Sequence, residues 1–392
     1  MTFGQNNRRK RIVIGGTYCV GKTETTKLLA KLTGIRPTLA RQAREIIAEI
    51  YPGQKLETLP PAGVHRLILE RFADRKANEA LVAPYGFISD GSALHEWAYG
   101  TARAVHGANG PDSRIIDPVF NGGLEVLGDV VKRHALEMYT HIVHLPIEFG
   151  IVDDEHRPVS EDFRAYADQL ILETWRELGY DPLIIGGTME ERVTAICEGL
   201  ELEISPTANG PKEKDGGLWY AQVEDLLGPR SDRYFASRFR NSDAFLTDVL
   251  VREDGKIATA TAEVDYLGGW SKKCGTECSR HLSSNDALML LGQMGQILMY
   301  TMDGITREES NNMWLGKETI ATRKPICASE GFTVRAEVTR DFYMDKEEEG
   351  VWHYAFMKAN FENGSFLVPE YQVGYKLPDR VAPIQRQKLQ SS

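Results

Sequence analysis

The sequence predicts two domains of different fold class: an α/β domain with a doubly wound parallel sheet, followed by an α+β domain. Three observations support this division. Over residues 1–203, short apolar runs alternate with amphipathic helical patterns. Over residues 218–392, strand patterns dominate around a single strongly helical segment. Residues 204–217 between them lack periodicity and are rich in turn formers and charge, which predicts a linker.

In the first domain, apolar runs short enough for buried parallel strands occur at 12–14, 85–90, 139–145 and 182–185. Helical spacing of apolar residues predicts helices over 23–32, 39–50, 64–82, 161–178 and 189–200. Strands that alternate with helices in this way favour βαβ units.

In the second domain, strands are predicted at 244–251, 256–264, 333–342, 352–361 and 365–375. The helix predicted over 284–302 carries an apolar stripe with small residues, Gly292 and Gly295, which suits close packing against a curved sheet. One long helix wrapped by antiparallel strands is the composition of a hotdog-like fold.

Composition limits the possible partners. The 392 residues carry a formal net charge of −10, which argues against nucleic acid as a general partner, because that binding depends on neutralising phosphates. No window approaches 18 apolar residues, and the N-terminus has no apolar signal-peptide core. We therefore expect a cytoplasmic protein with no membrane segment that acts on a small molecule.

Residues 16–23, GTYCVGKT, match the P-loop pattern G-x-x-x-x-G-K-[ST] between a predicted strand and a predicted helix. Its backbone N–H groups and the helix N-terminus suit phosphate oxygens. Lys22 is expected to reach the β- and γ-phosphates, and the Thr23 hydroxyl to bind Mg²⁺. The pattern predicts binding of a nucleoside triphosphate with Mg²⁺ through Gly16, Cys19, Val20, Gly21, Lys22, Thr23 and Glu24. We expect ATP, although the pattern does not distinguish ATP from GTP.

Asp90 ends a predicted buried strand, at the sheet edge where ligands bind in open α/β folds. It could take the proton from an acceptor hydroxyl or hold Mg²⁺ through water, as a catalytic and metal-site residue. The alternative is that Asp90 caps the next helix, a role for which Ser92 competes.

The order of the P-loop, residues 40–45 (ARQARE) and residues 87–90 (FISD) resembles small P-loop kinases of the nucleoside, nucleotide and nicotinamide riboside type. In that family, a helix after the P-loop lines the acceptor site. The resemblance therefore implies acceptor-binding roles for Arg41, Arg44 and Glu45. The family commonly has an Asp-Arg pair at the strand end, whereas this chain has Asp90-Gly91, which puts a phosphorylated acceptor in doubt.

The same family carries an arginine-bearing lid, and residues 153–158 (DDEHRP) fall where the lid would lie. The resemblance implies that Arg157, with Arg164 as a second candidate, stabilises charge on the transferring phosphoryl group. The alternative is a charged surface loop.

In the second domain, residues 269–273, 280–287 and 312–315 together resemble the avirulence protein D family, which is similar to hotdog-fold enzymes of the thioester dehydratase and butenolide-synthase type. The resemblance implies that Lys272, His281 and Asp286 form a site for an acyl chain or a sugar-like hydroxyketone. It also implies a homodimer through this domain. Asp286 and the serines before it would equally suit a helix start. Zinc at Cys274, Cys278 and His281 is disfavoured because a second ligand pair is absent.

Together these features predict an ATP-dependent kinase for a small hydroxyl-bearing metabolite such as a nucleoside, nucleotide or sugar, fused to a hotdog-like acyl- or sugar-handling domain. The alternative is a regulatory P-loop NTPase whose C-terminal domain only binds a ligand or a protein. A kinase that acts on bases in nucleic acid is a third reading, which the acidic balance disfavours.

Overall fold

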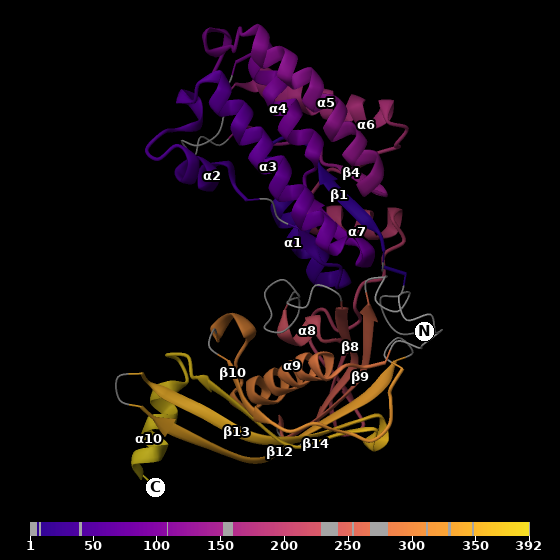
Figure 1. Ribbon diagram of the computed structural model, residues 1–392, viewed down its shortest axis with the longest axis vertical. Coiled ribbons are helices and arrows are strands. Elements are labelled where there is room, and N and C mark those ends of the chain that lie inside the picture. The colour runs from indigo at the N-terminus through magenta and orange to yellow at the C-terminus, as the bar shows by residue number, and fades with distance from the viewer. Residues whose placement is uncertain are drawn as a thin grey trace. The chain divides into compact units, whose positions relative to one another are not determined.

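The computed structural model describes residues 6–7, 9–38, 41–107, 109–151, 160–228, 242–252, 255–266, 281–310, 313–327, 331–346 and 349–391. Within it the chain forms two compact units, Gly4–Ile204 and Ser205–Ser392, called here the N-terminal and C-terminal units. Figure 1 shows helices around a sheet in the first unit and a curved sheet with a long helix in the second.

The N-terminal unit is built on a parallel sheet with strand order β2-β3-β1-β4-β5. Its strands are β1 (Arg11–Gly15), β2 (Pro37–Thr38), β3 (Phe87–Asp90), β4 (His141–His144) and β5 (Leu183–Ile184). Its helices are α1 (Lys22–Thr33), α2 (Ala43–Ile50), α3 (Pro61–Val82), α4 (Ala93–Val105), α5 (Pro118–Met138), α6 (Glu161–Glu177) and α7 (Met189–Gly199).

Helices cover both faces of this sheet because successive strand residues point to opposite sides. Val13 packs into one core with residues of α3 to α6, whereas Ile12 and Ile14 pack into another with residues of α1 and α7. The predicted doubly wound parallel fold is confirmed.

Two helices of this unit were not delimited from the sequence: α4, expected only as a helix after Asp90, and α5. The buried face of α4 mixes Leu94 and Ala98 with the polar side chains of His95, Glu96 and Arg103, so no clean apolar stripe marks it. The predicted helix at 39–50 begins at Ala43 in the structure, after the short strand β2.

The C-terminal unit is an antiparallel sheet with strand order β10-β14-β13-β12-β9-β8-β7-β6, with β11 paired to β14. Its strands are β6 (Lys212–Lys214), β7 (Gly217–Gln222), β8 (Ser242–Arg252), β9 (Ile257–Tyr266), β10 (Trp314–Glu318), β11 (Ala321–Thr322), β12 (Phe332–Asp345), β13 (Val351–Phe361) and β14 (Phe366–Lys376). Its helices are α8 (Glu224–Leu227), α9 (Ser284–Asp303) and α10 (Ala382–Ser391).

Helix α9 lies against this sheet and is buried over most of its length (Figure 1). Gly295 allows the close approach, because a Cβ there would lie 2.9 Å from the Val373 side chain on β14. The predicted hotdog-like α+β class of the second domain is confirmed.

Residues 204–217, expected to form a linker, belong largely to the folded C-terminal unit. Asp215 and Gly216, with φ of 50° and 74°, make the turn of the β6–β7 hairpin. Positive φ at both central residues is what a type I′ hairpin turn requires, and Asp-Gly supplies it. Ser205 and Thr207 are buried and donate to the Asp225 carboxylate. Turn formers therefore marked a hairpin rather than a linker.

Within the described residues, no helix is long and apolar enough to cross a membrane.

Candidate active site

The phosphate loop connects β1 to α1 and turns sharply at Gly16 (φ 110°), Cys19 (φ 59°) and Gly21 (φ 87°). A side chain at Gly16 would clash with the backbone oxygen of Leu145, so only glycine fits there. Helix α1 begins directly after this loop, at Lys22, and the N–H groups of its first turn are available to an anion.

Two buried arginines hold this loop from outside. Arg164 of α6 donates to the carbonyl oxygens of Tyr18 at 3.2 Å and Cys19 at 3.3 Å. Arg192 of α7 donates to the carbonyl oxygen of Val20 at 2.6 Å. Three successive carbonyl groups of the loop thus accept hydrogen bonds from these arginines. Arg164 is fully buried in this role, so the expectation that it acts on the phosphoryl group was wrong.

His95 of α4 supports the start of the loop. Its Nδ1 accepts the backbone N–H of Ser92 at 2.9 Å, which leaves Nε2 as the donor to the Gly16 carbonyl oxygen at 2.9 Å. Burial, together with the charges of Lys22 and Arg75, lowers the pKa of His95 well below its usual value. The imidazole is therefore neutral and fixed in one tautomer.

Thr23 and Asp90 meet beside the loop. The Thr23 hydroxyl donates to Oδ2 of Asp90 at 2.6 Å, and the Lys22 ammonium donates to the Thr17 carbonyl oxygen. A hydroxyl and a carboxylate oxygen at this spacing are ligands that Mg²⁺ prefers, so these residues fit the expected ion. Ser92, and not Asp90, is the N-cap of α4. The capping alternative for Asp90 was therefore wrong.

The other residues predicted near the nucleotide and acceptor lie on the surface. Glu24 is exposed and pairs with Lys27 at 3.0 Å. Arg41 pairs with Glu49 at 2.5 Å, with both side chains largely exposed. Arg44 is exposed, and Glu45 accepts the Gln42 N–H at 3.0 Å in the capping box of α2.

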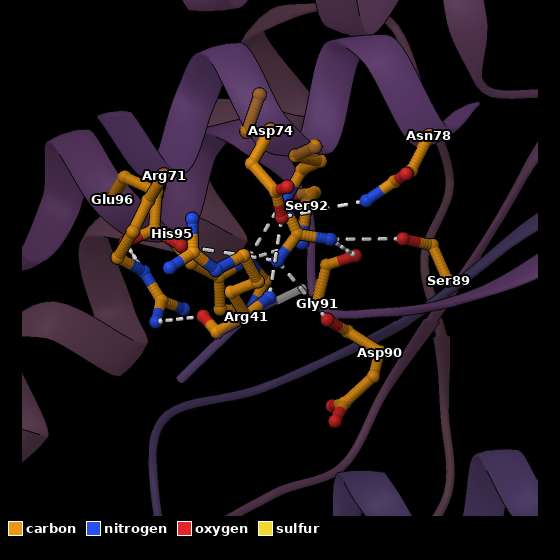
Figure 2. A network of polar contacts seen from close by, with 12 residues as sticks. Arg41, Arg71, Asp74, Asn78, Ser89, Asp90, Gly91, Ser92, His95 and Glu96 are labelled. Carbon is orange, nitrogen blue, oxygen red and sulfur yellow. Dashed lines mark hydrogen bonds and ion pairs between the residues drawn. The ribbon is translucent and has the colours of Figure 1, made fainter. Parts of the chain in front are cut away.

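The sequence analysis missed a buried arginine behind Asp90. Arg75 of α3 donates to the Ser89 hydroxyl at 2.9 Å, the Asp90 carbonyl oxygen at 3.1 Å and the Gly91 carbonyl oxygen at 3.2 Å. Figure 2 shows these three residues together at the end of β3. Gly91 has a φ of 76°, and a Cβ there would lie 3.5 Å from Arg75. The positive φ therefore disfavours a side chain where the kinase pattern has arginine, and an arginine from α3 donates to this turn instead.

Behind this turn, Glu79 forms the centre of a fully buried cluster. Its carboxylate accepts from the Ser89 hydroxyl at 2.9 Å and the Tyr139 hydroxyl at 2.8 Å, and it contacts His134 Nε2 at 3.0 Å. Burial and the Glu79 charge raise the pKa of Tyr139, so its hydroxyl stays protonated as a donor. The cluster fixes β3 against α3 and α5.

A second missed pair lies on the other side of Arg75. Arg71 of α3 donates through Nε to Glu96 Oε2 at 2.6 Å and through Nη1 to the Arg41 carbonyl oxygen at 2.7 Å. Glu96 of α4 is 5% exposed, and its Oε1 lies 3.8 Å from Arg75 Nη2. Figure 2 shows Glu96 and Arg71 facing each other, with Arg41 close by.

Two predicted site residues, Arg157 and Lys272, lie outside the described residues, as do Cys274 and Cys278. Asp286 is buried and forms a capping box with Ser283, whose hydroxyl donates to it. His281 is exposed and pairs through its backbone with Cys327. Within the part of the chain that the structure describes, no group of three or more His, Cys, Asp or Glu side chains could hold a metal ion.

The C-terminal unit has a different polar cluster, at the last residue of α9. Asp303 accepts from Tyr343 at 2.7 Å, from His353 Nδ1 at 2.6 Å and from the Tyr375 hydroxyl. The side chains of Asp303 and His353 are fully buried. A carboxylate is unfavourable at a helix C-terminus, and these donors compensate for that position.

Comparison with known proteins supports different relatives for the two units. Residues 11–192 match a family described as an AAA domain. The NadR protein, solved with NAD and AMP-PNP, is similar at 14% identity over half of each chain, with a TM-score of 0.34. Deoxyadenosine kinase from M. mycoides is similar at 13% identity over 49% of this chain and 98% of its own, with a TM-score of 0.35.

The N-terminal unit thus carries a P-loop on a parallel α/β sheet and matches the AAA-domain model. This chain spans about half the length of the NadR protein. No curated protein matches the chain.

Residues 218–293 and 290–366 match the Pseudomonas avirulence D protein (AvrD) family. A putative thioesterase, yhdA from Lactococcus lactis, is similar at 13% identity over 34% of this chain and 93% of its own, with a TM-score of 0.23. Both resemblances predicted from the sequence are confirmed.

Proposed function

We propose that the N-terminal unit is an ATP-dependent kinase that phosphorylates a hydroxyl group of a small metabolite such as a nucleoside, nucleotide or sugar. The observation that carries the proposal is the meeting of the Thr23 hydroxyl and the Asp90 carboxylate at 2.6 Å beside the phosphate loop. Buried polar side chains of α3 and α4 continue from this point along the sheet edge. A nucleotide site joined to such an edge suits transfer to a second substrate.

The chemistry requires mainly positioning and charge. The acceptor oxygen forms a bond to the γ-phosphorus, and the bond from that phosphorus to the bridging oxygen of ADP breaks. The hydroxyl proton passes to solvent water. Lys22 and the loop N–H groups hold the phosphates. Thr23 and Asp90 would hold Mg²⁺, which neutralises phosphate charge when bound.

For the C-terminal unit, we propose a hotdog-like domain that handles an acyl or sugar-like molecule. The AvrD match and the central helix on a curved sheet support this. Asp286 is engaged as a helix cap, so the proposal does not depend on it as a catalytic acid.

The test measures ATP consumption and product mass with nucleosides, nucleotides, pentoses and ketoses. Asp90→Asn is expected to lower phosphoryl transfer at least about 100-fold and to leave nucleotide binding in EDTA within about twofold, because it removes a metal ligand rather than the phosphate loop. Asp129→Asn, at an exposed position on α5, is the matched control. A regulatory NTPase would instead show no ATP turnover that depends on an acceptor, and that result would reject the kinase.

A further inference from the structure

We infer that Glu96 is the acceptor-binding residue of the kinase site, and that it selects an uncharged hydroxyl compound over its phosphate ester. This inference rests on the proposed kinase function. Neither the P-loop pattern nor the family resemblance pointed to Glu96.

Only one of the two carboxylate oxygens of Glu96 accepts a hydrogen bond among the described residues. Oε2 accepts from Arg71 Nε at 2.6 Å, whereas Oε1 is buried without a hydrogen bond among the described residues. The Glu96 side chain is only 5% exposed. A buried carboxylate oxygen without a hydrogen bond is costly, because it has lost water and has only the Arg75 Nη2 group, 3.8 Å away, in exchange. A donor from a bound molecule would remove that cost.

The position of Glu96 suits an acceptor hydroxyl. It lies in the first turn of α4, the helix that follows Asp90 directly at the ligand-binding edge of the sheet. Arg71 joins it to the backbone of Arg41, just before α2, so three segments of the unit converge there. Asp90 itself is engaged with the Thr23 hydroxyl, on the nucleotide side. Of these two carboxylates, Glu96 is thus the one with a buried oxygen that accepts no hydrogen bond among the described residues.

The local charges oppose a phosphorylated acceptor. Arg71 pairs with Glu96 at 2.6 Å, and Arg75 pairs with Glu79 at 3.7 Å, so the two positive charges are balanced by two negative ones. The Arg75 Nη groups already donate to carbonyl oxygens and to Ser89. This layer therefore has no surplus positive charge for a phosphate, and the Glu96 carboxylate would repel one. A hydroxyl, which donates without carrying charge, fits instead.

The experiment compares acceptors in pairs: adenosine, cytidine, uridine, guanosine, ribose and fructose, each with its 5′- or 6-phosphate ester. We expect the best acceptor to be unphosphorylated and to exceed its ester at least about tenfold in kcat/KM. Glu96→Gln should lower kcat/KM for that acceptor by about 10- to 100-fold, mainly through KM, because a charge-assisted hydrogen bond is lost. Glu70→Gln, at an exposed position on α3, is the matched control and should stay within about twofold.

Thermal stabilisation by ATP shows that each variant is folded. If ATP does not stabilise Glu96→Gln, the test uses Glu96→Asp, which keeps the negative charge beside Arg71. The same increase in acceptor KM is then expected of Glu96→Asp. Equal or better use of the phosphate esters, or an acceptor KM within about twofold of wild type, overturns the inference and leaves the kinase standing. Absence of ATP turnover with every acceptor overturns the proposed function, and the inference with it.

Discussion

The neutral state of His95 predicts a specific loss of stability in mild acid. Its Nδ1 accepts from the Ser92 N–H, and its Nε2 donates to the Gly16 carbonyl oxygen. A proton added at Nδ1 would place two donors against each other in a buried site, close to the Lys22 charge. His95→Asn removes the titration, while its side-chain oxygen can still accept from Ser92 at this N3 position of α4.

The sign and size of the effect follow from linkage. The pKa of His95 is well below 6.5 in the folded protein, so the unfolded chain binds more protons in mild acid. The contribution of His95 is complete above about pH 6.5, the unfolded value, and is lost as the pH falls below it. The slope approaches about 1.4 kcal/mol per pH unit for one group. The variant lacks this slope but loses the Gly16 hydrogen bond, at a pH-independent cost of about 1 kcal/mol.

The assay must report on the N-terminal unit alone, and Cys197 provides this. It is buried in that unit, and burial raises the pKa of its thiol to about 11, which slows alkylation in the folded state. Urea unfolding from pH 5.0 to 7.5, followed by a thiol-labelling pulse at one fixed pH and mass spectrometry of the Cys197 peptide, gives the free energy of unfolding. His106→Asn is the matched control. If His95→Asn keeps the wild-type slope between pH 5.5 and 6.5, the reasoning is refuted.

Two other predictions concern backbone and core. Gly16→Ala should destabilise the N-terminal unit by more than about 2 kcal/mol and abolish ATP-induced thermal stabilisation, because its φ of 110° and the nearby Leu145 carbonyl group exclude a side chain; an alanine variant that binds ATP normally would contradict this. Asp303→Asn should lower the free energy of unfolding of the C-terminal unit by about 3 kcal/mol in urea, because a buried acceptor of several hydrogen bonds becomes partly a donor. A decrease below about 0.5 kcal/mol would show that the cluster contributes little to stability.

The parts of the fold that the sequence predicted well are those fixed by local pattern. The phosphate loop needs particular residues at fixed spacing, so residues 16–23 could be placed with their strand and helix. Asp90 was expected at the sheet edge because it ends an apolar run, and it does lie there, against Thr23. In both cases a few adjacent residues contain the whole signal.

The prediction was poorer where contacts join distant segments. Arg41, Arg44 and Glu45 were chosen because they follow the loop in the order of a known family. In the structure Arg41 pairs with Glu49, Glu45 caps α2, and Arg44 is exposed. Arg164 was assigned to a lid, although its partners are carbonyl oxygens about 145 residues earlier. Spacing along the chain does not encode such partners, since they depend on how α6 packs against the loop.

Charged residues at the core-facing positions of a helix are the sequence signal that could have revealed the buried polar network behind Asp90. Arg71, Arg75 and Glu79 recur every four residues on α3, in step with Leu67, which is buried. A solvated charge has no reason to follow the core-facing positions, and a buried one must be paired. Three such charges in step therefore predict a buried polar network on the inner face of this helix. The ligand-binding edge of the sheet lies beside α3 through β3, so that network would have been expected at the strand end, where Arg75 and Glu96 are found.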